Sequence, residues 1–475
     1  MKMLINGKWK GGKKTAEVRS PYSGEVIDTV PVADAADVES ALSAAEQGAK
    51  QMAAMPACER AAILRRAADL CEERAEELAQ TMVAEVGKPV LEARAEAGRA
   101  AEILRLAAFE GAHLRGETLP LDALAIPPAE DKFGMTVPIP CGVVVAITPF
   151  NFPVLLVLHK IAPALAVGNA VILKPASATP LSALKLAAIM MEAGLPPGGL
   201  QCLCGGGGVV GAALCKDSRV RKISFTGSFA VGEQIAKDAG VKKLSLELGA
   251  NSPCVVLADA DIKAAVQSGA VGGYANAGQV CISMQRVLAD EKIYDDYVSG
   301  IAEHAKAIRC GDPADENTKL AAMISENEAA RVDSWVGEAV NDGARLITGG
   351  KRDGAKFAAT VLADVKPQMR VFCDEVFGPA IGITKIKGLS GALELLAKDS
   401  YGLSASVFTN DIGNALHFAR AARCGNVHIN WTPMWRNDMM PYGGVGKSGI
   451  GKEGVRSTVR EMCEDKTIVF HNAKK

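Results

Sequence analysis

The sequence has no excess of charge of either sign. Its 475 residues include 53 basic and 54 acidic side chains, which gives a formal net charge of -1. It contains no basic run, and basic residues do not alternate with aromatic ones. Proteins that bind nucleic acid need such a surface to hold the phosphate backbone. We therefore expect no nucleic-acid partner, and a small molecule as the substrate.

Closely spaced cysteine pairs are also lacking. The twelve cysteines form no Cys-x-x-Cys motif, and only Cys202 and Cys204 lie near each other in the sequence. Zinc sites and redox dithiols usually carry that spacing, so we expect no metal site. Reduced cysteines are typical of the cytosol, and a cytoplasmic protein is predicted.

No apolar run reaches the length of about 20 residues that spans a bilayer. Prolines and polar residues interrupt the most apolar region, residues 142–173, at Pro149, Asn151, Pro153, His159, Lys160, Pro163 and Asn169. The N-terminal residues lack the apolar segment and cleavage site of a signal peptide. We expect residues 142–173 to form buried core, with no membrane contact and no export.

Aromatic residues make up only 5% of the chain, whereas hydrophobic residues make up 49% and glycine is abundant. This composition is typical of a globular α/β enzyme whose core packs through small side chains. A chain of 475 residues exceeds the size at which one hydrophobic core usually stops growing. More than one domain is therefore expected.

Strand and helix patterns divide the sequence into segments. An Asn-Gly turn predicts a hairpin at residues 4–9, and apolar residues at helical spacing predict several helices in residues 34–115. From Gly142 onwards, short apolar strands alternate with helices. The predicted strands are 143–147, 170–174, 200–203 and 222–225, and helices begin at Pro153 and Pro180. This alternation predicts a doubly wound parallel sheet.

A second α/β domain is predicted from Pro253 to about Val445, with helices at 262–277 and 294–309. Residues 118–140 carry few helix signals and several prolines, which favours an extended arm or an ordinary loop. The segment 466–471 has a strand pattern and could add to the sheet edge of a partner.

Cys281 stands alone in the stretch Gly278-Gln-Val-Cys-Ile-Ser283. A thiolate is a strong nucleophile, so this cysteine is a candidate for covalent catalysis. The alternative is an ordinary buried cysteine, which is the commoner case. The choice depends on which other polar residues accompany it.

Two residues in apolar surroundings favour the catalytic alternative. Asn151 lies in a rigid loop, residues 148–153, after a predicted strand, where its amide could stabilise an oxyanion. Glu247 lies in the segment Leu246-Glu-Leu-Gly249, where loss of solvation raises a carboxyl pKa and suits it to general-base work. The alternatives are a turn asparagine that bonds its own backbone and a partly buried structural glutamate.

Residues 225–232 follow a strand and open a helix, so their backbone N–H groups and Ser228 could hold a diphosphate. The pattern GxGxxG instead occurs within residues 206–211, in a run of glycines where a match is almost unavoidable. We interpret that run as a tight strand-to-helix turn. Glu375 is a candidate hydrogen-bond partner for a ribose.

With these segments in this order between residues 6 and 466, the chain resembles the aldehyde dehydrogenase superfamily. The segments that carry the resemblance are 148–153, 225–232, 247–249, 278–281, 375–379 and 440–454. The resemblance implies a Rossmann-type NAD(P)-binding domain, an α/β catalytic domain and a small β oligomerisation arm, assembled as a homodimer or homotetramer. These units are expected at residues 1–117 with 138–247, at 248–447, and at 118–137 with 455–475.

The resemblance also implies residue roles. Cys281 attacks the aldehyde, Asn151 and the Cys281 N–H hold the oxyanion, and Glu247 activates the water that releases the acid. Glu453 could relay protons. The residues implied to bind NAD or NADP are Thr148, Pro149, Phe150, Lys174, Ser177, Gly227, Ser228, Gly232, Leu248, Glu375 and Phe377.

Two residues depart from the family pattern. Ser177 ends the segment Lys174-Pro-Ala-Ser where NAD-preferring relatives often carry glutamate. Nothing there repels a 2'-phosphate, so the choice between NAD and NADP stays open. Ala250 replaces the usual glycine near Glu247, and its methyl group could alter the reach of that base.

Residues 159–163, 174–180, 279–283 and 436–444 carry a closer resemblance, to members that use small polar or anionic aldehydes. These aldehydes are lactaldehyde, phosphonoacetaldehyde, sulfoacetaldehyde and, in the non-phosphorylating enzymes, glyceraldehyde-3-phosphate. Arg436, with His159 and Arg105, is expected to bind the anionic end, because arginine donates paired hydrogen bonds to such groups. Alternatively, His159 is a core histidine, Arg105 a solvated helix residue, and Arg436 part of a loop salt bridge. Val280 argues against the anion-site interpretation, since relatives that use phosphorylated aldehydes often carry arginine before the cysteine.

Two other activities stay open. One is an acylating aldehyde dehydrogenase that transfers the acyl group to coenzyme A, and the other is a broad-specificity enzyme for neutral aldehydes. Glu247 favours hydrolysis, because acylating members usually lack this glutamate. A non-enzymatic protein of the same fold is disfavoured, because Cys281, Asn151 and Glu247 are all present.

Overall fold

The computed structural model describes residues 1–471, and its largest sheet is the predicted, mainly parallel one. Within these residues the sheet has eight strands, in the order β2 (Lys8–Lys10), β1 (Met3–Ile5), β9 (Leu200–Cys202), β8 (Ala170–Lys174), β7 (Val143–Ile147), β10 (Val220–Thr226), β11 (Lys243–Glu247) and β21 (Gly449–Ile450). Strands β9, β8, β7, β10 and β11 are parallel. The hairpin β1–β2 turns through Asn6 and Gly7, whose φ angles of 48° and 70° confirm the Asn-Gly prediction.

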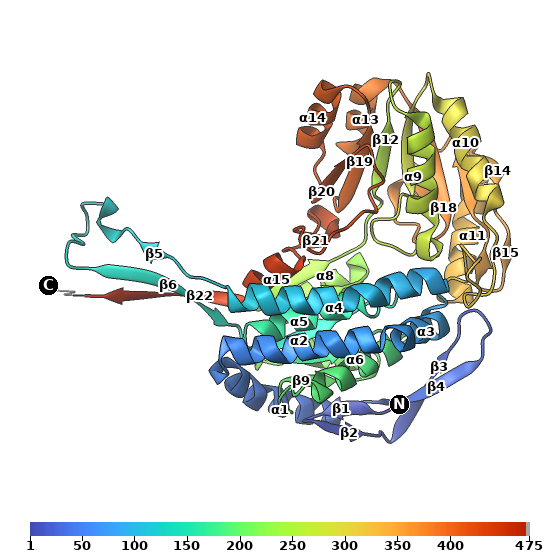
Figure 1. The fold of residues 1–475 in the computed structure, drawn as a ribbon. Coiled ribbons are helices and arrows are strands. Elements are labelled where there is room, and N and C mark those ends of the chain that lie inside the picture. Colours follow the sequence, from blue (N-terminus) through green and yellow to red (C-terminus); the bar gives the residue numbers. More distant parts are fainter. Residues whose placement is uncertain (472–475) are drawn as a thin grey trace.

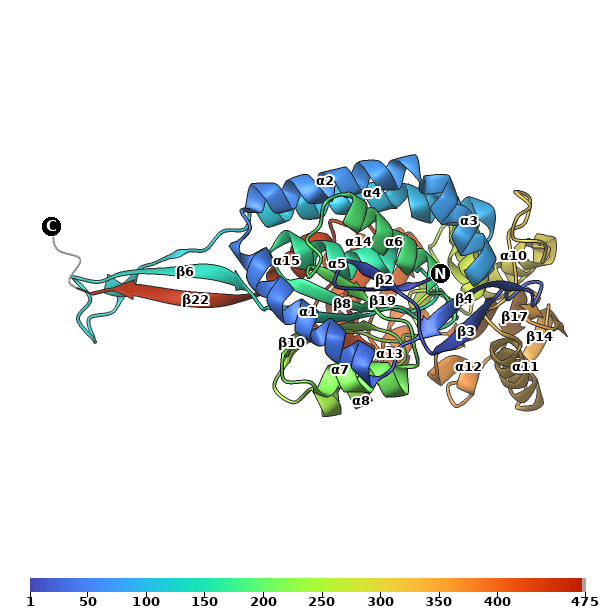
Figure 2. The same ribbon diagram turned by 90° about the horizontal axis from the view of Figure 1, so that it is seen from below.

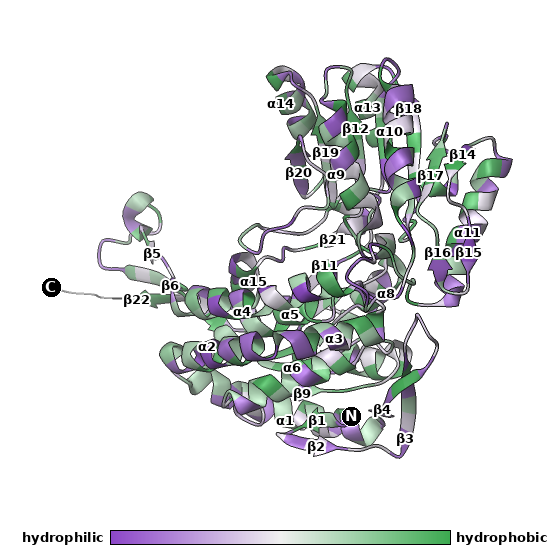
Figure 3. Ribbon diagram, turned by 45° about the vertical axis from the view of Figure 1, so that its right-hand side comes forward, coloured by the Kyte–Doolittle hydropathy of each residue, from purple (hydrophilic) through white to green (hydrophobic). Residues whose placement is uncertain are grey.

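Helices cover this sheet and confirm the helical pattern of residues 34–115. They are α1 (Ala35–Ala54), α2 (Ala57–Glu73), α3 (Ala75–Val86), α4 (Val90–Ala112), α5 (Leu155–Ala166), α6 (Leu181–Glu192), α7 (Ala212–Lys216) and α8 (Phe229–Ala239). Every residue of α5 is buried. Helix α2 instead alternates hydrophilic and hydrophobic residues, as Figure 3 shows, because only one of its faces meets the core.

Helix α5 begins at Leu155, two residues after the expected start at Pro153. The carboxylate of Glu96, on α4, accepts hydrogen bonds from the N–H groups of Val154 and Leu155 at 3.0 and 3.1 Å. A side chain distant in sequence therefore satisfies the first free N–H groups of the helix. Glu96 also forms a buried ion pair with Lys88. The start of α5, just after the Asn151 loop, is thus fixed by α4.

A second sheet lies above the first unit in Figure 1 and has its own hydrophobic core. Its strands, within the described residues, follow the order β14 (Arg345–Thr348), β17 (Thr360–Ala363), β18 (Ala380–Ile386), β13 (Arg286–Asp290), β12 (Pro253–Val256), β19 (Ser404–Phe408) and β20 (Asn426–Ile429). All pairs except β14–β17 are parallel. The helices of this unit are α9 (Ile262–Tyr274), α10 (Tyr294–Ala307), α11 (Glu326–Asn341), α12 (Arg370–Cys373), α13 (Gly388–Leu396) and α14 (Ile412–Ala421).

A three-stranded sheet projects from the body of the molecule, as Figures 1 and 2 show. It contains β5 (Thr118–Leu119), β6 (Phe133–Pro140) and β22 (Cys463–Phe470). Strand β22 pairs antiparallel with β6 along its whole length, from Cys463 opposite Pro140 to Phe470 opposite Phe133. The C-terminal strand therefore pairs within its own chain, and addition to a partner's sheet stays a prediction. Residues 472–475 lie outside the described residues.

The arm differs in extent from the expected boundaries. Strand β6 continues to Pro140, beyond residue 137. Helix α15 (Val455–Glu461) packs against α4 and α5 instead of joining the arm, because Val455 and Val459 are buried in the first core. Two small hairpins complete the fold, β3 (Lys14–Arg19) with β4 (Val26–Val32) and β15 (Arg352–Asp353) with β16 (Lys356–Phe357). Among residues 1–471, no helix combines the length and apolarity needed to cross a membrane.

Candidate active site

Cys281 lies in the connection between α9 and β13, after an unusual turn. Asn276, Ala277 and Gly278 have φ angles of 48°, 55° and 69°, so three successive residues adopt the left-handed conformation. This conformation costs roughly 1–2 kcal/mol for each non-glycine residue, and neighbouring contacts must hold it. Glu92 of α4 supplies one of them, by accepting a hydrogen bond from the Asn276 N–H at 2.8 Å. The turn places the cysteine between the two large sheets.

The Asn151 loop is joined to this turn by hydrogen bonds in both directions. The Nδ2 atom of Asn151 donates to the Gln279 carbonyl at 2.8 Å, and Nδ2 of Asn276 donates to the Asn151 carbonyl at 3.2 Å. Asn151 is 3% exposed, and its Oδ1 has no partner within the described residues. The structure therefore brings the predicted oxyanion donor to the predicted nucleophile's loop.

The Sγ atom of Cys281 lies 2.9 Å from the hydroxyl of Tyr442. Burial raises the pKa of the Cys281 thiol to about 12, and the hydrogen bond to Tyr442 opposes that rise. The carboxylates of Glu247 and Glu375 also raise it, whereas Arg436 lowers it. In this structure the sulfur is thus a neutral thiol at pH 7, and its ionisation depends on groups that donate to it.

Glu247 ends β11 with a buried carboxylate. Within the described residues neither of its oxygens has a hydrogen-bond partner. Burial raises the pKa of this carboxyl well above its usual range, and the negative charge of Glu453 raises it further. A Cβ atom on Gly443 would lie 2.6 Å from Oε1 of Glu247, so only glycine leaves room for the carboxylate there. This is the environment predicted for a general base.

Arg436 and His159, the two residues expected at an anion site, lie in contact with each other. Nη2 of Arg436 lies 3.2 Å from Nδ1 of His159, and Nε2 of His159 lies 3.1 Å from the Asp438 carboxylate. Burial lowers the pKa of His159 to about 4, and the positive charge of Arg436 lowers it further. His159 is therefore neutral at pH 7.

The expected third member of this group, Arg105, is not part of it. Its guanidinium lies on the outer side of α4 and forms salt bridges with Asp69, Glu72 and Glu102. Helix α4 contributes Arg99 instead, whose Nη2 lies 2.7 Å from the Asp438 carboxylate. The helical pattern did not reveal which arginine faces the site, because that depends on how α4 packs.

Two further residues were not singled out from the sequence. The guanidinium of Arg436 lies 3.9 Å above the centre of the Tyr442 ring. Lys160 forms a buried ion pair with Glu453, whose other carboxylate oxygen lies 3.7 Å from Arg436. Tyr442 lies inside the segment 440–454, which carries the family resemblance, and Lys160 directly follows His159 in the sequence; those positions were the available signal.

The expected cofactor residues gather at the carboxyl ends of the parallel strands, where open α/β sheets bind ligands. Ser228 precedes α8 as its N-cap residue, but its side chain does not cap the helix, so the first N–H groups stay available. Nζ of Lys174 donates to the Pro175 carbonyl at 3.1 Å, and Oγ of Ser177 donates to the Gly205 carbonyl at 3.1 Å. The buried hydroxyl of Thr148 has no partner within the described residues.

Glu375 and Phe377 approach the same region from the second unit. Oε1 of Glu375 accepts a hydrogen bond from the Ala250 N–H at 3.0 Å, and burial raises the pKa of this carboxyl to about 7. The rings of Phe150 and Phe377 meet edge to face, 6.0 Å apart. A Cβ atom on Gly232 would lie 2.3 Å from the Leu248 side chain, so the glycine allows α8 to pack closely against Leu248. Free hydroxyls, a free helix N-terminus and a buried carboxylate together fit a dinucleotide.

The run of glycines connects β9 to α7, as expected, but the turn is wide and not tight. Residues Gly207–Gly211 form a wide helical turn that leads into α7. A Cβ atom at Gly206, Gly207 or Gly208 would meet nothing within 4 Å. No neighbouring atom within the described residues therefore requires glycine at these three positions, and the interpretation of the GxGxxG match as a chance match stays a prediction.

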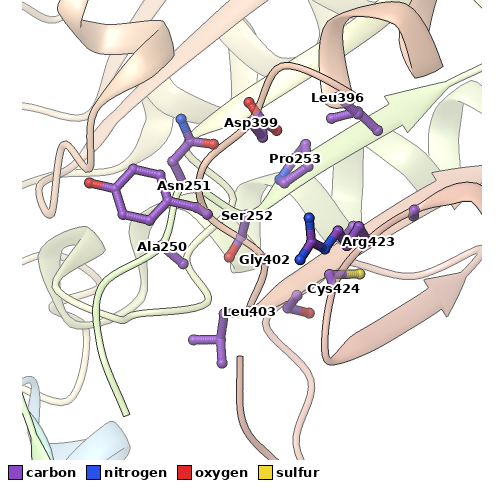
Figure 4. Close-up of a pocket in the computed structure, with 14 residues that line it drawn as sticks. Ala250, Asn251, Ser252, Pro253, Leu396, Asp399, Gly402, Leu403, Arg423 and Cys424 are labelled. Carbon is purple, nitrogen blue, oxygen red and sulfur yellow. The ribbon is translucent and has the colours of Figure 1, made fainter. Parts of the chain in front are cut away.

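A separate cavity of about 30 Å³ lies behind Ala250, between the Asn251–Pro253 segment and residues 396–405, as Figure 4 shows. Neither Cys281 nor Glu247 lines it. Its volume suits one or two water molecules. The Ala250 methyl group packs with Val280 and Tyr442 in a small hydrophobic cluster, and its effect on Glu247 stays a prediction.

Comparison with known proteins agrees with this geometry. The profile of the aldehyde dehydrogenase family matches residues 9–468. The 3-sulfolactaldehyde dehydrogenase of Priestia aryabhattai is 42% identical over 469 residues, which cover 99% of this chain and 98% of the relative. The lactaldehyde dehydrogenase of Methanococcus aeolicus is 38% identical, with 99% and 100% covered.

Solved structures show the same fold. An NAD-dependent aldehyde dehydrogenase from Sinorhizobium meliloti superposes with a TM-score of 0.96 at 36% identity, covering 100% of this chain and 95% of that one. Glyceraldehyde-3-phosphate dehydrogenase GapN from Methanocaldococcus jannaschii, complexed with NADP, gives 0.93 at 39% identity, with 97% and 100% covered. These findings confirm the predicted fold, the dehydrogenase class and the use of NAD or NADP. The chain belongs to the aldehyde dehydrogenase family.

Proposed function

We propose that this aldehyde dehydrogenase oxidises a small anionic or hydroxylated aldehyde to its carboxylic acid through a thioester on Cys281. The observation that carries the substrate class is the position of Arg436. Its side chain is only 12% exposed, and it lies against Tyr442, which contacts the Cys281 sulfur. Nε of Arg436 has no partner among the described residues. The nearest carboxylate oxygen, on Glu453, lies 3.7 Å from Nη2 of Arg436, beyond hydrogen-bond range. A largely buried cation beside the nucleophile that no carboxylate hydrogen-bonds suits an anionic substrate group.

In the first step the Cys281 sulfur attacks the aldehyde carbon and forms a thiohemiacetal. Nδ2 of Asn151 and the N–H of Cys281 donate to the oxyanion. Nδ2 of Asn151 donates to the Gln279 carbonyl in this structure, so one of its two hydrogens stays available for the substrate. The position of Asn151 is fixed by the loop contacts, which limits the rearrangement needed during reaction.

NAD or NADP, when bound, would supply the hydride acceptor. Ser228, Lys174, Ser177, Glu375 and Phe377 would hold it, with Thr148 and Gly227 beside them. Departure of hydride from the thiohemiacetal carbon leaves a thioester on Cys281. Glu247 then takes a proton from water, which attacks the thioester and releases the acid. The two unpartnered oxygens of Glu247 suit this role, and its raised pKa places the base closer to working pH.

Arg436 would donate two hydrogen bonds to the anionic end of the substrate, while His159 accepts one of its other N–H groups. Val280 packs in an apolar cluster directly before the nucleophile, so no second cation stands at that position. A single cation favours a small carboxylate, sulfonate or hydroxyl group over a phosphate. Relatives named for 3-sulfolactaldehyde and lactaldehyde support this class.

The larger organisation is proposed from the same resemblance. We infer that residues 1–117 and 141–247 bind the cofactor and that residues 248–447 form the catalytic domain. The arm built on β6 and β22, which includes residues 138–140, would join subunits into a homodimer or homotetramer. Exposed apolar side chains on the arm, Phe133, Val469 and Phe470, support a protein contact there. We also propose a cytoplasmic location, from the reduced cysteines.

The proposal is tested by initial rates of NADH and NADPH formation with a panel of aldehydes. The panel contains propanal, lactaldehyde, succinic semialdehyde, glyceraldehyde-3-phosphate, phosphonoacetaldehyde and sulfoacetaldehyde. A strong kcat/KM preference for one anionic or hydroxylated member is expected. Equal rates with propanal would instead show a broad-specificity enzyme, and turnover that requires coenzyme A would show an acylating one.

A further inference from the structure

Tyr442 reaches the Cys281 sulfur from the C-terminal segment, which is distant in sequence. Its hydroxyl lies 2.9 Å from Sγ, and its side chain is 3% exposed. The Tyr442 backbone is paired with Glu453 in both directions, which fixes the main chain from which the ring extends. At this distance a hydroxyl and a thiol form one hydrogen bond, in which either group can be the donor. A thiolate carries no proton, so in the ionised state only Tyr442 can be the donor.

The groups around the sulfur make this donor important. Glu247 and Glu375 face Cys281 with carboxylates that disfavour a thiolate, and Arg436 is the cation that favours one. Arg436 lies over the Tyr442 ring, with its guanidinium 3.9 Å from the ring centre. A cation over the ring attracts electron density from the phenol and strengthens its O–H as a donor. Within the described residues, the Tyr442 hydroxyl is the one side-chain group that forms a hydrogen bond with the Cys281 sulfur.

We propose that Tyr442 is a further catalytic residue, whose hydroxyl donates a hydrogen bond to the Cys281 thiolate and increases the fraction of enzyme that carries the nucleophile. This inference rests on the proposed role of Cys281. The thiol proton leaves to water, and Tyr442 keeps its own proton throughout. Once the sulfur bonds to the aldehyde carbon its negative charge is gone, so the hydrogen bond weakens and does not hold back the later steps.

The magnitude of the effect follows from two opposing factors. A lost hydrogen bond to an anion is expected to raise the thiol pKa by about one unit, which lowers the thiolate fraction about tenfold. A less stabilised thiolate is more nucleophilic, by about threefold for one pKa unit. The net fall in the rate of attack is therefore about threefold to fourfold at any pH below the thiol pKa.

The test is alkylation of Cys281 by iodoacetamide in Tyr442→Phe, from pH 6 to pH 10. Peptide mass spectrometry separates Cys281 from the exposed Cys58 and Cys373. Tyr297→Phe is the matched control, because it removes a buried hydroxyl that has no hydrogen-bond partner among the described residues. The expected result is alkylation about threefold to fourfold slower in Tyr442→Phe below the thiol pKa and unchanged in Tyr297→Phe.

The direction of the change separates this role from a purely structural one. If the hydroxyl only covers the sulfur, its removal exposes Cys281 and alkylation becomes faster. Equal or faster alkylation in Tyr442→Phe at every pH would overturn the proposal. Alkylation needs neither aldehyde nor cofactor, so this result is independent of whether the enzyme prefers anionic aldehydes. With the preferred aldehyde, kcat/KM should fall by a similar factor.

Discussion

The Nδ1 atom of His159 accepts a hydrogen bond from Arg436 across 3.2 Å, while Nε2 of the same ring faces the Asp438 carboxylate at 3.1 Å. Arginine always donates, so Nδ1 is unprotonated and Nε2 carries the proton. Arg99 in turn holds Asp438 at 2.7 Å. Arg99, Asp438 and His159 therefore form a chain of contacts that ends at Arg436 and holds its guanidinium over the Tyr442 ring.

The free energy of unfolding should depend on pH through the protonation of His159. Its pKa is lowered from 6.5 to about 4 by burial and by Arg436. As the pH falls, the unfolded chain binds the His159 proton before the folded protein does. The contribution of neutral His159 to the free energy of unfolding is therefore fully present above about pH 6.5 and is lost as the pH falls towards 4. The loss amounts to about 3 kcal/mol. His159→Gln keeps a donor and an acceptor but does not titrate, so urea denaturation should show a flatter pH profile for this variant.

The exposed residue His113 provides the control for that experiment. His113→Gln should keep the wild-type profile between pH 6.5 and pH 4. Indistinguishable profiles for His159→Gln and wild type would show that the histidine is not held neutral.

Arg436→Gln should lower kcat/KM for anionic aldehydes about 10-fold to 100-fold relative to propanal, because charge-assisted hydrogen bonds contribute roughly 1.5–3 kcal/mol. The ratio between the two substrates is the quantity to measure, since Arg436 also touches Tyr442 and its loss slows both reactions. Arg105→Gln is the matched control, because its salt bridges lie on the exposed face of α4. An unchanged ratio in Arg436→Gln would place the substrate anion elsewhere.

Glu247→Gln should stop the reaction at the thioester. The amide fits the same space, and neither carboxylate oxygen has a partner to lose among the described residues. Loss of a general base slows hydrolysis by about 10²- to 10⁴-fold, so rapid mixing should show a burst near one NADH or NADPH per subunit and then slow turnover. In the wild type, the raised pKa of Glu247 means that hydrolysis accelerates as the pH rises. Steady turnover without a burst in the variant would remove Glu247 from this role.

Ser177→Glu should lower the activity of the enzyme with NADP relative to its activity with NAD. Ser177 is exposed and bonds the Gly205 carbonyl at 3.1 Å, so a longer side chain has room to extend. A carboxylate near a 2'-phosphate repels it, and the kcat/KM ratio of NADP to NAD should fall at least about tenfold. Ser177→Ala, which adds no charge, should leave the ratio within about twofold. The same ratio in Ser177→Glu and wild type would show that this residue does not face the adenosine ribose.

The fold class, the alternation of strands and helices after Gly142 and the family could all be predicted from residue patterns. Cys281, Asn151, Glu247 and Glu375 were identifiable because each lies in a short segment whose residue types suit one chemical task. The hairpin at Asn6-Gly7 was equally predictable, since its φ angles follow from two adjacent residues. Such features depend on residues close together in the sequence, so they can be predicted without knowing how the chain packs.

The contacts between side chains that lie far apart in the sequence could not be predicted and became visible only in the folded chain. Nothing in the pattern of α4 distinguishes Arg99, which reaches Asp438, from Arg105, which meets α2. Glu96 fixes the start of α5, and Tyr442 reaches Cys281 across 161 residues. Such contacts depend on the rotation and depth at which helices and loops pack. Packing is set by the sum of many weak, non-local interactions, so no short segment of the sequence encodes it.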